Sequence, residues 1–431
     1  MMRLSILAVG ILVIASVTTF AQGTIRISGT IVDNDNGQPL ELASISLKGR
    51  SLGTVTNADG KFDLYLSPGF VQDTVLVSFL GYSPFTGPAM ELNGATVRLK
   101  SRPLVLEQVV IRDKTPKPEE IILRAFAKIE DNYPTNPYVY SGFMREAWSQ
   151  NDKTVSMVEG VVDIHDDGYR LRKDKTVRVR EKVDLKFTRA SANQMNASFR
   201  PLIEKYNTLT AMLKWNQVKY PHPDFTEMKG KEVVLENVVF SNGRSLYQVS
   251  FISHSRENDL FERKDSYYID SETFSIKKVE WREYSKNGTY RGLPGSIDSA
   301  RTYQARDVVT TYEFEEFKGK MYLKYYREHG EGDIYNTKTK VIEYKIAGDA
   351  MFVVTGINIE GSAGKLNDTM DRSRSLSLQA TPYDETFWKN YDQVKLVPLT
   401  DKQLKDLELN ETLAEQFRKS GYRNLKRRGR P

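Results

Sequence analysis

Apolar and polar residues alternate along short segments through most of this chain, and clusters of turn residues separate the segments. In the first segment, Ile25, Ile27 and Ile31 alternate with polar residues ahead of the turn-forming residues 33–37. A period of two is that of a β-strand with one buried face, because successive side chains point to opposite sides of the strand. We therefore expect a mainly β protein whose strands are joined by tight turns.

The bulk composition is that of a folded, soluble protein with more than one domain. The 431 residues are 39% hydrophobic and 27% charged, and this length suffices for two or three domains with separate cores. The chain has no cysteine, which excludes disulfides and thiolate metal sites. It also excludes a lipoprotein anchor, because that lipid is attached to a cysteine at the cleavage site.

Residues 1–21 have the pattern of a secretory signal peptide. Arg3 precedes the apolar residues 4–20, and Thr19 and Ala21 are the small residues expected before cleavage ahead of Gln22. The continuously apolar part is shorter than the roughly 20 residues that span a bilayer, and an uncleaved anchor is the alternative interpretation. We expect an exported protein of the periplasm or outer membrane, for which nucleic acid is not an expected partner.

The net charge of +6 is concentrated at the C-terminal end of the chain. Residues 418–431 hold seven lysines and arginines and no acidic residue, so the rest of the chain is close to neutral. Such a basic tail could lie on an anionic lipid surface. The simpler interpretation is a solvated, disordered end of the chain.

A specific set of motifs lies in residues 22–111. Residues 27–33 read Ile-Ser-Gly-Thr-Ile-Val-Asp, residues 53–62 contain Gly-Thr-Val-Thr-Asn and Asp-Gly-Lys-Phe, and residues 79–82 read Phe-Leu-Gly-Tyr. With residues 106–110, Leu-Glu-Gln-Val-Val, they resemble the carboxypeptidase-regulatory-like domain, an immunoglobulin-like sandwich of the transthyretin type. That domain also stands at the N-terminus of many TonB-dependent receptors. The resemblance implies a domain without catalytic residues, and the receptors' plug and barrel are not expected in the rest of this chain.

Residues 112–118 are expected to form a linker, because Pro116 and Pro118 disfavour both a helix interior and a central strand. A helix is expected to begin at Pro118. Residues 119–365 are expected to form a large antiparallel sheet, a half-barrel with a few helices on its concave side, and one helix at residues 202–213. The strands are expected in a simple meander, at residues 233–240, 245–252, 266–269, 274–281, 309–317, 321–327, 338–346 and 351–359.

The segment at residues 267–278 resembles, at a low level, the half-barrel of lipoprotein carriers. A membrane barrel is not expected, because charges such as Lys277, Lys278 and Glu280 fall on both faces of one strand.

Residues 366–417 are expected to be helical, ahead of the basic tail. The residues Thr400 to Gln403 fit a capping box at the start of a helix. Just before it, Phe387, Trp388 and Tyr391 are expected to dock on the sheet.

Asp163, His165 and Asp167 are the candidate metal-binding residues. At positions i, i+2 and i+4 of a strand they would share one face, and two carboxylates with an imidazole could hold a divalent cation. The alternative is a hairpin tip, because the sequence Asp-Asp-Gly at residues 166–168 is a turn signal. His254 and Glu257, with His329 downstream, have the spacing of a zinc carboxypeptidase, but an antiparallel meander is not the fold that presents such ligands.

The sequence therefore predicts a mainly β, non-enzymatic binding or scaffold protein of the cell envelope, with no cofactor. The expected partners are an envelope protein bound by the sandwich and a lipid or glycan ligand held on the curved sheet. The alternatives are a structural accessory subunit of an outer-membrane complex and a metal-dependent hydrolase that uses Asp163, His165 and Asp167. The first two differ in whether the inward face of the sheet is open or filled by the helix at residues 202–213.

Overall fold

The computed structural model describes residues 24–427 except 51, 103–115, 171–178, 193, 196–199, 221–231, 242, 254–260, 286–290, 293–299, 361–366 and 392–397. Its strands are β1 (Ile25–Asp33), β2 (Ser44–Leu47), β3 (Gly53–Val55), β4 (Lys61–Leu66), β5 (Thr74–Ser78), β6 (Phe85–Pro88), β7 (Ala95–Leu99), β8 (Tyr138–Gln150), β9 (Lys153–Asp166), β10 (Lys182–Ala190), β11 (Glu232–Ser241), β12 (Arg244–Ser253), β13 (Phe261–Asp270), β14 (Ile276–Ser285), β15 (Arg291–Gly292), β16 (Arg301–Phe317), β17 (Lys320–Asn336) and β18 (Val341–Asn358). Its helices are α1 (Pro118–Ala127), α2 (Ile129–Asn132), α3 (Arg200–Lys205), α4 (Thr208–Lys214), α6 (Glu385–Asn390), α7 (Asp401–Leu407) and α8 (Leu413–Arg427), with 3-10 turns η1 (Pro68–Phe70), η2 (Ala89–Leu92) and η3 (Leu376–Gln379).

The N-terminal strands form the expected β-sandwich. One sheet has the order β4-β1-β7 and the other the order β3-β2-β5-β6, and β1 runs parallel to β7. The alternating residues of the sequence, Ile27, Ile45 and Val77 among them, are fully buried between the two sheets. The sandwich prediction is confirmed for the described residues, while the closing segment at residues 109–111 lies outside them.

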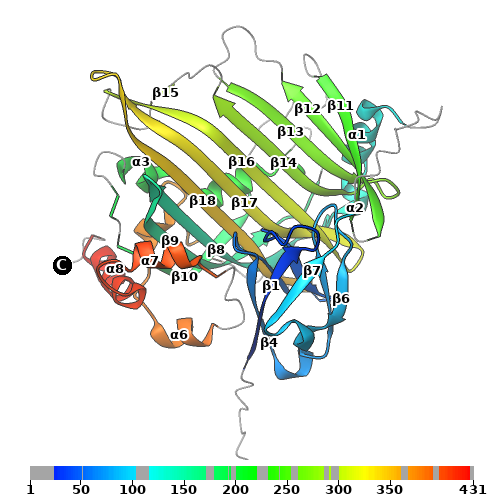
Figure 1. Cartoon of the computed structure of the whole chain (residues 1–431), viewed down its shortest axis with the longest axis horizontal. Coiled ribbons are helices and arrows are strands. Elements are labelled where there is room, and N and C mark those ends of the chain that lie inside the picture. The colour runs from blue at the N-terminus through cyan, green and yellow to red at the C-terminus, as the bar shows by residue number, and fades with distance from the viewer. Residues whose placement is uncertain are drawn as a thin grey trace, which may run out of the picture.

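The second part of the chain is built on one large antiparallel sheet, seen face-on in Figure 1. Its strand order is β10-β9-β8-β18-β17-β16-β14-β13-β12-β11, and β15 also pairs with β16. The expected simple meander is therefore incomplete. It holds from β11 to β18, but β8 then pairs with β18, so that the first strands of this domain extend the sheet beyond its last one.

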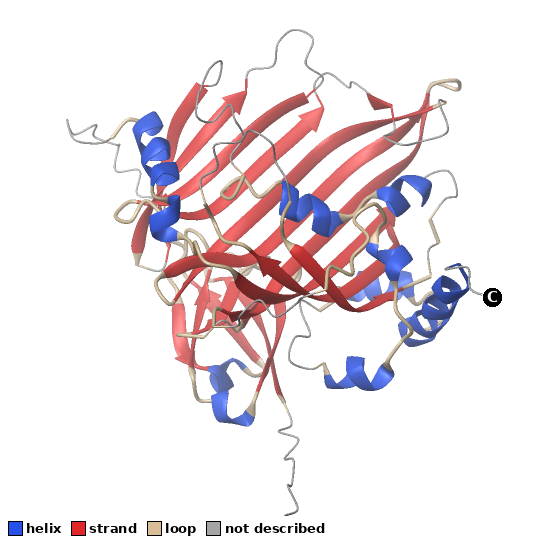
Figure 2. Cartoon of the chain, turned by 180° about the vertical axis from the view of Figure 1, so that it is seen from behind, coloured by secondary structure: helices blue, strands red, loops and turns tan. Residues whose placement is uncertain are grey.

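Short helices cover one face of this sheet, which we call the helix-covered face (Figure 2). Ile121 and Ile122 of α1 and Leu209 and Leu213 of α4 are buried there in a continuous hydrophobic cluster. The single helix expected at residues 202–213 is instead two helices. The first, α3, ends at Lys205. The second, α4, begins after Asn207, whose side chain caps it by accepting a hydrogen bond from the backbone N–H of Thr210.

The sandwich and the C-terminal helices lie on the opposite face, which we call the sandwich-covered face (Figure 1). The capping box is confirmed, because the side chains of Thr400 and Gln403 each accept a hydrogen bond from the other residue's backbone N–H. The docking of the aromatic residues is also confirmed. Phe387 stacks on Phe187 of β10, and Trp388 is 5% exposed in a cluster with residues of β8, β9, β17 and β18.

Two further expectations are corrected. The strands expected at residues 338–346 and 351–359 are the single strand β18, because Ala347 to Ala350 pair without interruption with both β17 and β8. The first part of the basic tail is not a disordered end, since α8 continues to Arg427 and its Arg418 forms an ion pair with Glu385. The expected signal peptide, the linker residues up to 115, and His254 with Glu257 lie outside the described residues.

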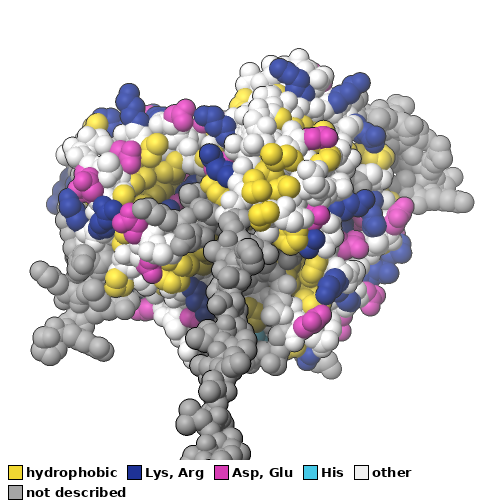
Figure 3. Space-filling view, turned by 90° about the horizontal axis from the view of Figure 1, so that it is seen from below, with side chains coloured by type: hydrophobic (Ala, Val, Ile, Leu, Met, Phe, Trp, Pro, Cys, Tyr) yellow, Lys and Arg dark blue, Asp and Glu magenta, His cyan; other side chains and the backbone are white. Residues whose placement is uncertain are grey.

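The surface seen from the sandwich end mixes hydrophobic patches with charges of both signs (Figure 3). This agrees with a chain whose charge is close to neutral ahead of its C-terminal tail. Among the helices that the structure describes, none combines the length and the hydropathy that crossing a membrane requires.

Candidate functional site

The three candidate metal-binding residues are not brought together. Asp163 and His165 lie on β9, while the strand ends at Asp166 and leaves Asp167 beyond it. Asp163 accepts a hydrogen bond from Ser141 and lies 3.4 Å from the ammonium of Lys186. Within the described part of the chain no group of three metal-binding side chains is found. The turn expected after β9 is present, with the backbone N–H of Gly168 donating to the Asp166 carboxylate.

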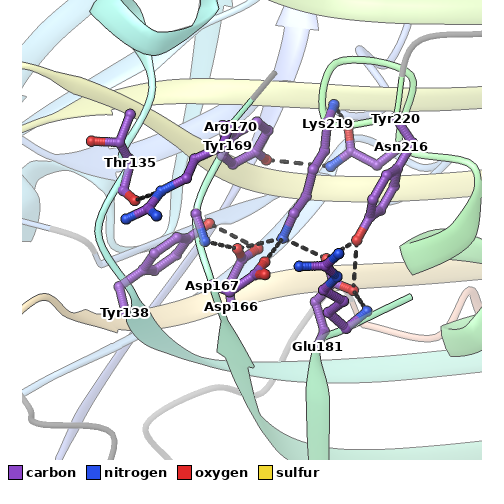
Figure 4. A network of polar contacts seen from close by, with 12 residues as sticks. Thr135, Tyr138, Asp166, Asp167, Tyr169, Arg170, Glu181, Asn216, Lys219 and Tyr220 are labelled. Carbon is purple, nitrogen blue, oxygen red and sulfur yellow. Dashed lines mark hydrogen bonds and ion pairs between the residues drawn. The ribbon is translucent and has the colours of Figure 1, made fainter. Parts of the chain in front are cut away.

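Asp166 and Asp167 belong instead to a buried ion cluster on the helix-covered face (Figure 4). The Lys219 ammonium lies 2.5 Å from Asp166 Oδ1, 2.6 Å from Glu181 Oε1 and 3.3 Å from Asp167 Oδ1. The side chains of Lys219, Asp166 and Glu181 are 3%, 5% and 1% exposed. The cluster thus ties together three segments: the end of β9, the residue before β10, and the loop after α4.

The surroundings of this cluster keep Lys219 charged. Burial acts to lower the pKa of Lys219, but the carboxylates of Asp166 and Glu181 reverse this and raise it well above its ordinary value. Tyr138 donates to Asp166 and Tyr220 donates to Glu181, which satisfies further carboxylate oxygens. A lysine with so high a pKa does not donate its proton near neutral pH. The cluster therefore stabilises the packing of the three segments.

A second buried cluster, with the charges reversed, lies on the sandwich-covered face. Glu159 is 1% exposed and lies between Arg145 and Arg189, each with a guanidinium nitrogen 2.6 Å from a carboxylate oxygen. Burial acts to raise the pKa of Glu159, but the charges of Arg189 and Arg145 lower it to about 2. The Arg189 guanidinium also lies over the rings of Trp388 and Phe417, at 4.1 and 4.6 Å from their centroids. This cluster therefore anchors the C-terminal segment to the sheet.

A third cluster joins the sandwich to the sheet. Arg327 of β17 lies 2.7 Å from Glu41 of the sandwich and 2.7 Å from Asp349 of β18. His329 Nδ1 is 3.2 Å from the same Asp349 carboxylate. Burial acts to raise the pKa of Asp349, but His329 and Arg327 together lower it to about 2. The hydrogen bond to Asp349 in turn raises the pKa of His329.

This third cluster lines a cavity of about 510 Å³ between the sandwich, the sheet and the residues just before α7. Its wall includes Arg145, Arg327, His329 and Asp349 from the sheet and Leu42 from the sandwich. The volume lies within the range of about 300–1,000 Å³ that is usual for ligand cavities. A second cavity, of about 720 Å³, lies beside it, between β2 and β5 of the sandwich and β14, β16 and β17 of the sheet.

Two carboxylates on the helix-covered face, Glu146, which is buried, and Glu328, which is half-buried, have neutral hydrogen-bond partners. Glu146 accepts hydrogen bonds from Thr208 and Trp148, and Glu328 accepts them from Tyr206 and Tyr326. Burial raises the pKa of both carboxyl groups. They hold α4 and the residues before it against β8 and β17.

Few features of the sequence indicate these clusters. Glu159 stands between Met157 and Val161, so a charge at an inward position of an apolar strand could have marked it. Lys219 lies in a loop without a recognisable pattern, and its partners are more than 35 residues away. Both cavities form between parts of the chain that are distant in sequence, which alternation alone does not reveal.

Comparison with known proteins bears on the sandwich. Residues 27–111 match the model of the CarboxypepD_reg-like domain. A stretch of 97 residues is 38% identical to the TonB-dependent receptor SusC of Bacteroides thetaiotaomicron. The match covers 22% of this chain and only 9% of the receptor's length.

The solved structures to which the chain has a low similarity include the following two proteins. One is a putative outer membrane lipoprotein-sorting protein domain from Vibrio parahaemolyticus, with 10% identity, coverage of 57% of this chain and 94% of that one, and a TM-score of 0.24. The other is a LolA superfamily protein from Nitrosomonas europaea, with 11% identity, coverage of 60% and 99%, and a TM-score of 0.24. Such TM-scores do not establish a shared fold. What the comparisons establish is that residues 27–111 of this chain form a CarboxypepD_reg-like domain, as the sequence motifs predicted.

Proposed function

We propose that this chain is a non-enzymatic scaffold protein of the cell envelope, which presents its sandwich to another envelope component. The observation that carries the proposal is that the sandwich, the part similar to a TonB-dependent receptor, is held firmly against the large sheet. Arg327 bridges the two parts through Glu41, and Ser46 donates a hydrogen bond to Glu315. Val55 of the sandwich belongs to one hydrophobic cluster with Tyr325 and Val353 of the sheet. A domain held in this way offers its remaining surface in a fixed orientation.

The filling of the helix-covered face favours this role over a ligand carrier of the kind expected from the sequence. Leu209 and Leu213 of α4 are 0% and 4% exposed, and they pack on the sheet where the lipid or glycan was expected to lie. Among the described residues, these buried side chains occupy that position on the sheet. The ligand position expected on the inward face is therefore not part of the proposal.

The hydrolase alternative also loses its support. Asp163 and Asp167 are engaged by different lysines, Lys186 and Lys219, and these lie on different sides of the sheet. Nothing in their arrangement favours a shared metal ion, so catalysis is not included in the proposed function.

The proposal is tested by fractionating the source cells and recording native mass spectra of the protein purified from the envelope fraction. We expect it in that fraction, with a protein partner that cross-links to the sandwich. Met90 of the sandwich is 44% exposed and Leu409, next to α7, is 69% exposed. Met90→Asp should reduce recovery of the partner, whereas the matched change Leu409→Asp should not. Recovery from the cytosol, or as a free monomer from the envelope, would contradict the proposal.

A further inference from the structure

The larger of the two cavities, of about 720 Å³, has an apolar wall on its sandwich side. Leu76 of β5 and the two residues that follow this strand, Phe79 and Leu80, line it and are only half-buried. Phe79 packs on the core of the sandwich, and Leu80 packs on a small cluster that includes Leu246 and Tyr268 of the sheet. The parts of these side chains that remain exposed can cover an apolar molecule. The volume is in the usual range for a ligand of drug or single-chain lipid size.

The sheet side of the cavity is lined by lysines, two of which are placed there by β-bulges. Tyr268 of β13 pairs with Lys278 of β14, but the next residue, Ile269, pairs with Ile276. Lys277 is therefore the additional residue of a bulge in β14. In the same way, Glu313 of β16 pairs with Tyr325 of β17 and Phe314 pairs with Leu323, so Lys324 is the additional residue of a bulge in β17. A bulge reorients side chains relative to the regular alternation of a strand, so Lys277 lines the same cavity as its neighbour Lys278.

Lys277 differs from Lys278 and Lys324 in how its ammonium is paired. Lys278 lies 2.7 Å from a Glu280 oxygen, and Lys324 lies 3.5 Å from Glu315. For Lys277 the closest carboxylate found among the described residues is Glu316, at 4.0 Å, while the ammonium contacts the sulfur of Met321 at 3.1 Å. Its side chain is 19% exposed.

The electrostatics agree with a cation that lacks a close partner. Burial lowers the pKa of Lys277, and the neighbouring acids, Asp270 and Glu316, do not restore it. Around the whole cavity seven lysines and arginines face five aspartates and glutamates, so the wall has an excess of positive charge. An anion placed at Lys277 would supply a closer counter-charge than Glu316 does.

We propose that this cavity binds an anionic single-chain lipid, with its carboxylate or phosphate head at Lys277 and its acyl chain against Leu76, Phe79 and Leu80. The apolar wall favours a lipid over free inorganic phosphate, and the cation favours an anionic head over a neutral one. The site lies on the sandwich-covered face and adds a ligand to the scaffold role proposed above. It does not depend on that role.

The test uses the purified, delipidated protein and two fluorescent probes, dansyl-undecanoic acid and its methyl ester. We expect saturable binding of the acid, with the ester bound roughly tenfold or more weakly, as for loss of a charge-assisted hydrogen bond. Lys277→Met should remove this preference. Lys264→Met, the same change at an exposed lysine that pairs with Glu236 outside the cavity, should retain it. Leu76→Trp, which fills the cavity, should weaken both probes.

Three results would contradict the proposal. Absence of saturable acid binding rejects the site. Equal binding of acid and ester by the wild type rejects the role of Lys277, and this readout needs no variant and so does not depend on whether Lys277→Met folds. Complete displacement of the acid by millimolar inorganic phosphate would show an anion site without a lipid chain. Partner recovery through the sandwich is measured separately, so either proposal can fail without the other.

Discussion

The two faces of the large sheet are packed in different ways. On the helix-covered face, one continuous hydrophobic cluster runs from α1 across the sheet to the segment around Leu376 and Ala380. On the sandwich-covered face the hydrophobic contacts form smaller, separate clusters, with ion pairs and two cavities between them. The first face is the core of the domain, whereas the second has the mixed character of an interface between domains.

The buried charge clusters around Lys219 and Glu159 differ between the two faces in the same way. Lys219 lies between two carboxylates and joins segments within the core, while Glu159 lies between two arginines and holds the C-terminal segment on the outside. The comparison indicates that a change on the helix-covered face should reduce the stability of the whole sheet. A change on the sandwich-covered face should loosen the docking and leave the sheet folded.

The largest effect is expected for Lys219→Met. The substitution leaves Asp166 and Glu181 buried without a cation, which should lower the free energy of unfolding by about 3–5 kcal/mol. All four tryptophans lie outside the sandwich, so their fluorescence in a urea titration reports on the sheet. Lys186→Met, which removes an exposed lysine paired with Asp184, should cost less than about 1 kcal/mol. Equal losses for the two variants would remove the distinction between core and surface pairs.

The second effect contrasts two leucines. Leu209→Ala empties a fully buried position on the helix-covered face, and about 2–5 kcal/mol of stability should be lost. Leu76→Ala removes a half-buried side chain beside the larger cavity, and the loss should stay below about 1.5 kcal/mol. Thermal and urea unfolding measure both. A larger loss for Leu76→Ala would mean that the cavity wall is part of the core.

A smaller effect is expected at the contact between sandwich and sheet. Arg327→Met removes the bridge between Glu41 and Asp349, which are both partly exposed, so the loss should be about 1 kcal/mol. Its main consequence should be faster amide hydrogen exchange in residues 41–56, with the exchange of β8 and β18 unchanged. Lys61→Met, which breaks the exposed pair with Asp401, is the control and should leave both regions unchanged.

The smallest effect is a dependence on pH at His329. Its pKa is raised in the folded protein by the hydrogen bond to Asp349, and the charges of Asp349 and Glu331 raise it further, while burial and the charge of Arg327 oppose this. Protonated His329 therefore stabilises the contact below its unfolded pKa of about 6.5, and this contribution is lost as the pH rises through the folded value. The free energy of unfolding should therefore fall between pH 6 and pH 8, and it should fall less in His329→Gln. An unchanged slope would assign the dependence to another group.

The extent to which the candidate sites could be predicted differs between them. The turn after Asp166 was predicted because Asp-Asp-Gly is a local signal, but the use of Asp166 and Asp167 as partners of Lys219 was not. From the sequence alone, Lys277 and Lys278 are recognisable only as charges that fall on both faces of one strand. The bulge at Lys277, which explains this pattern, depends on pairing with β13. A bulge also breaks the period of two, and β16 begins before its expected start, with a bulge at Arg306 in the additional part.

The sequence by itself determined the sandwich, the mainly β character, the docking aromatics and the capping box at Thr400. These features depend on alternation, turn chemistry and caps, which act over a few residues, or on motifs that resemble a known domain. Only the tertiary structure decided that β8 pairs with β18, that α4 fills one face of the sheet, and that the sandwich encloses cavities on the other. The physical reason is that these contacts join segments far apart in the chain. Their free energy comes from buried area and paired charges that no local pattern encodes.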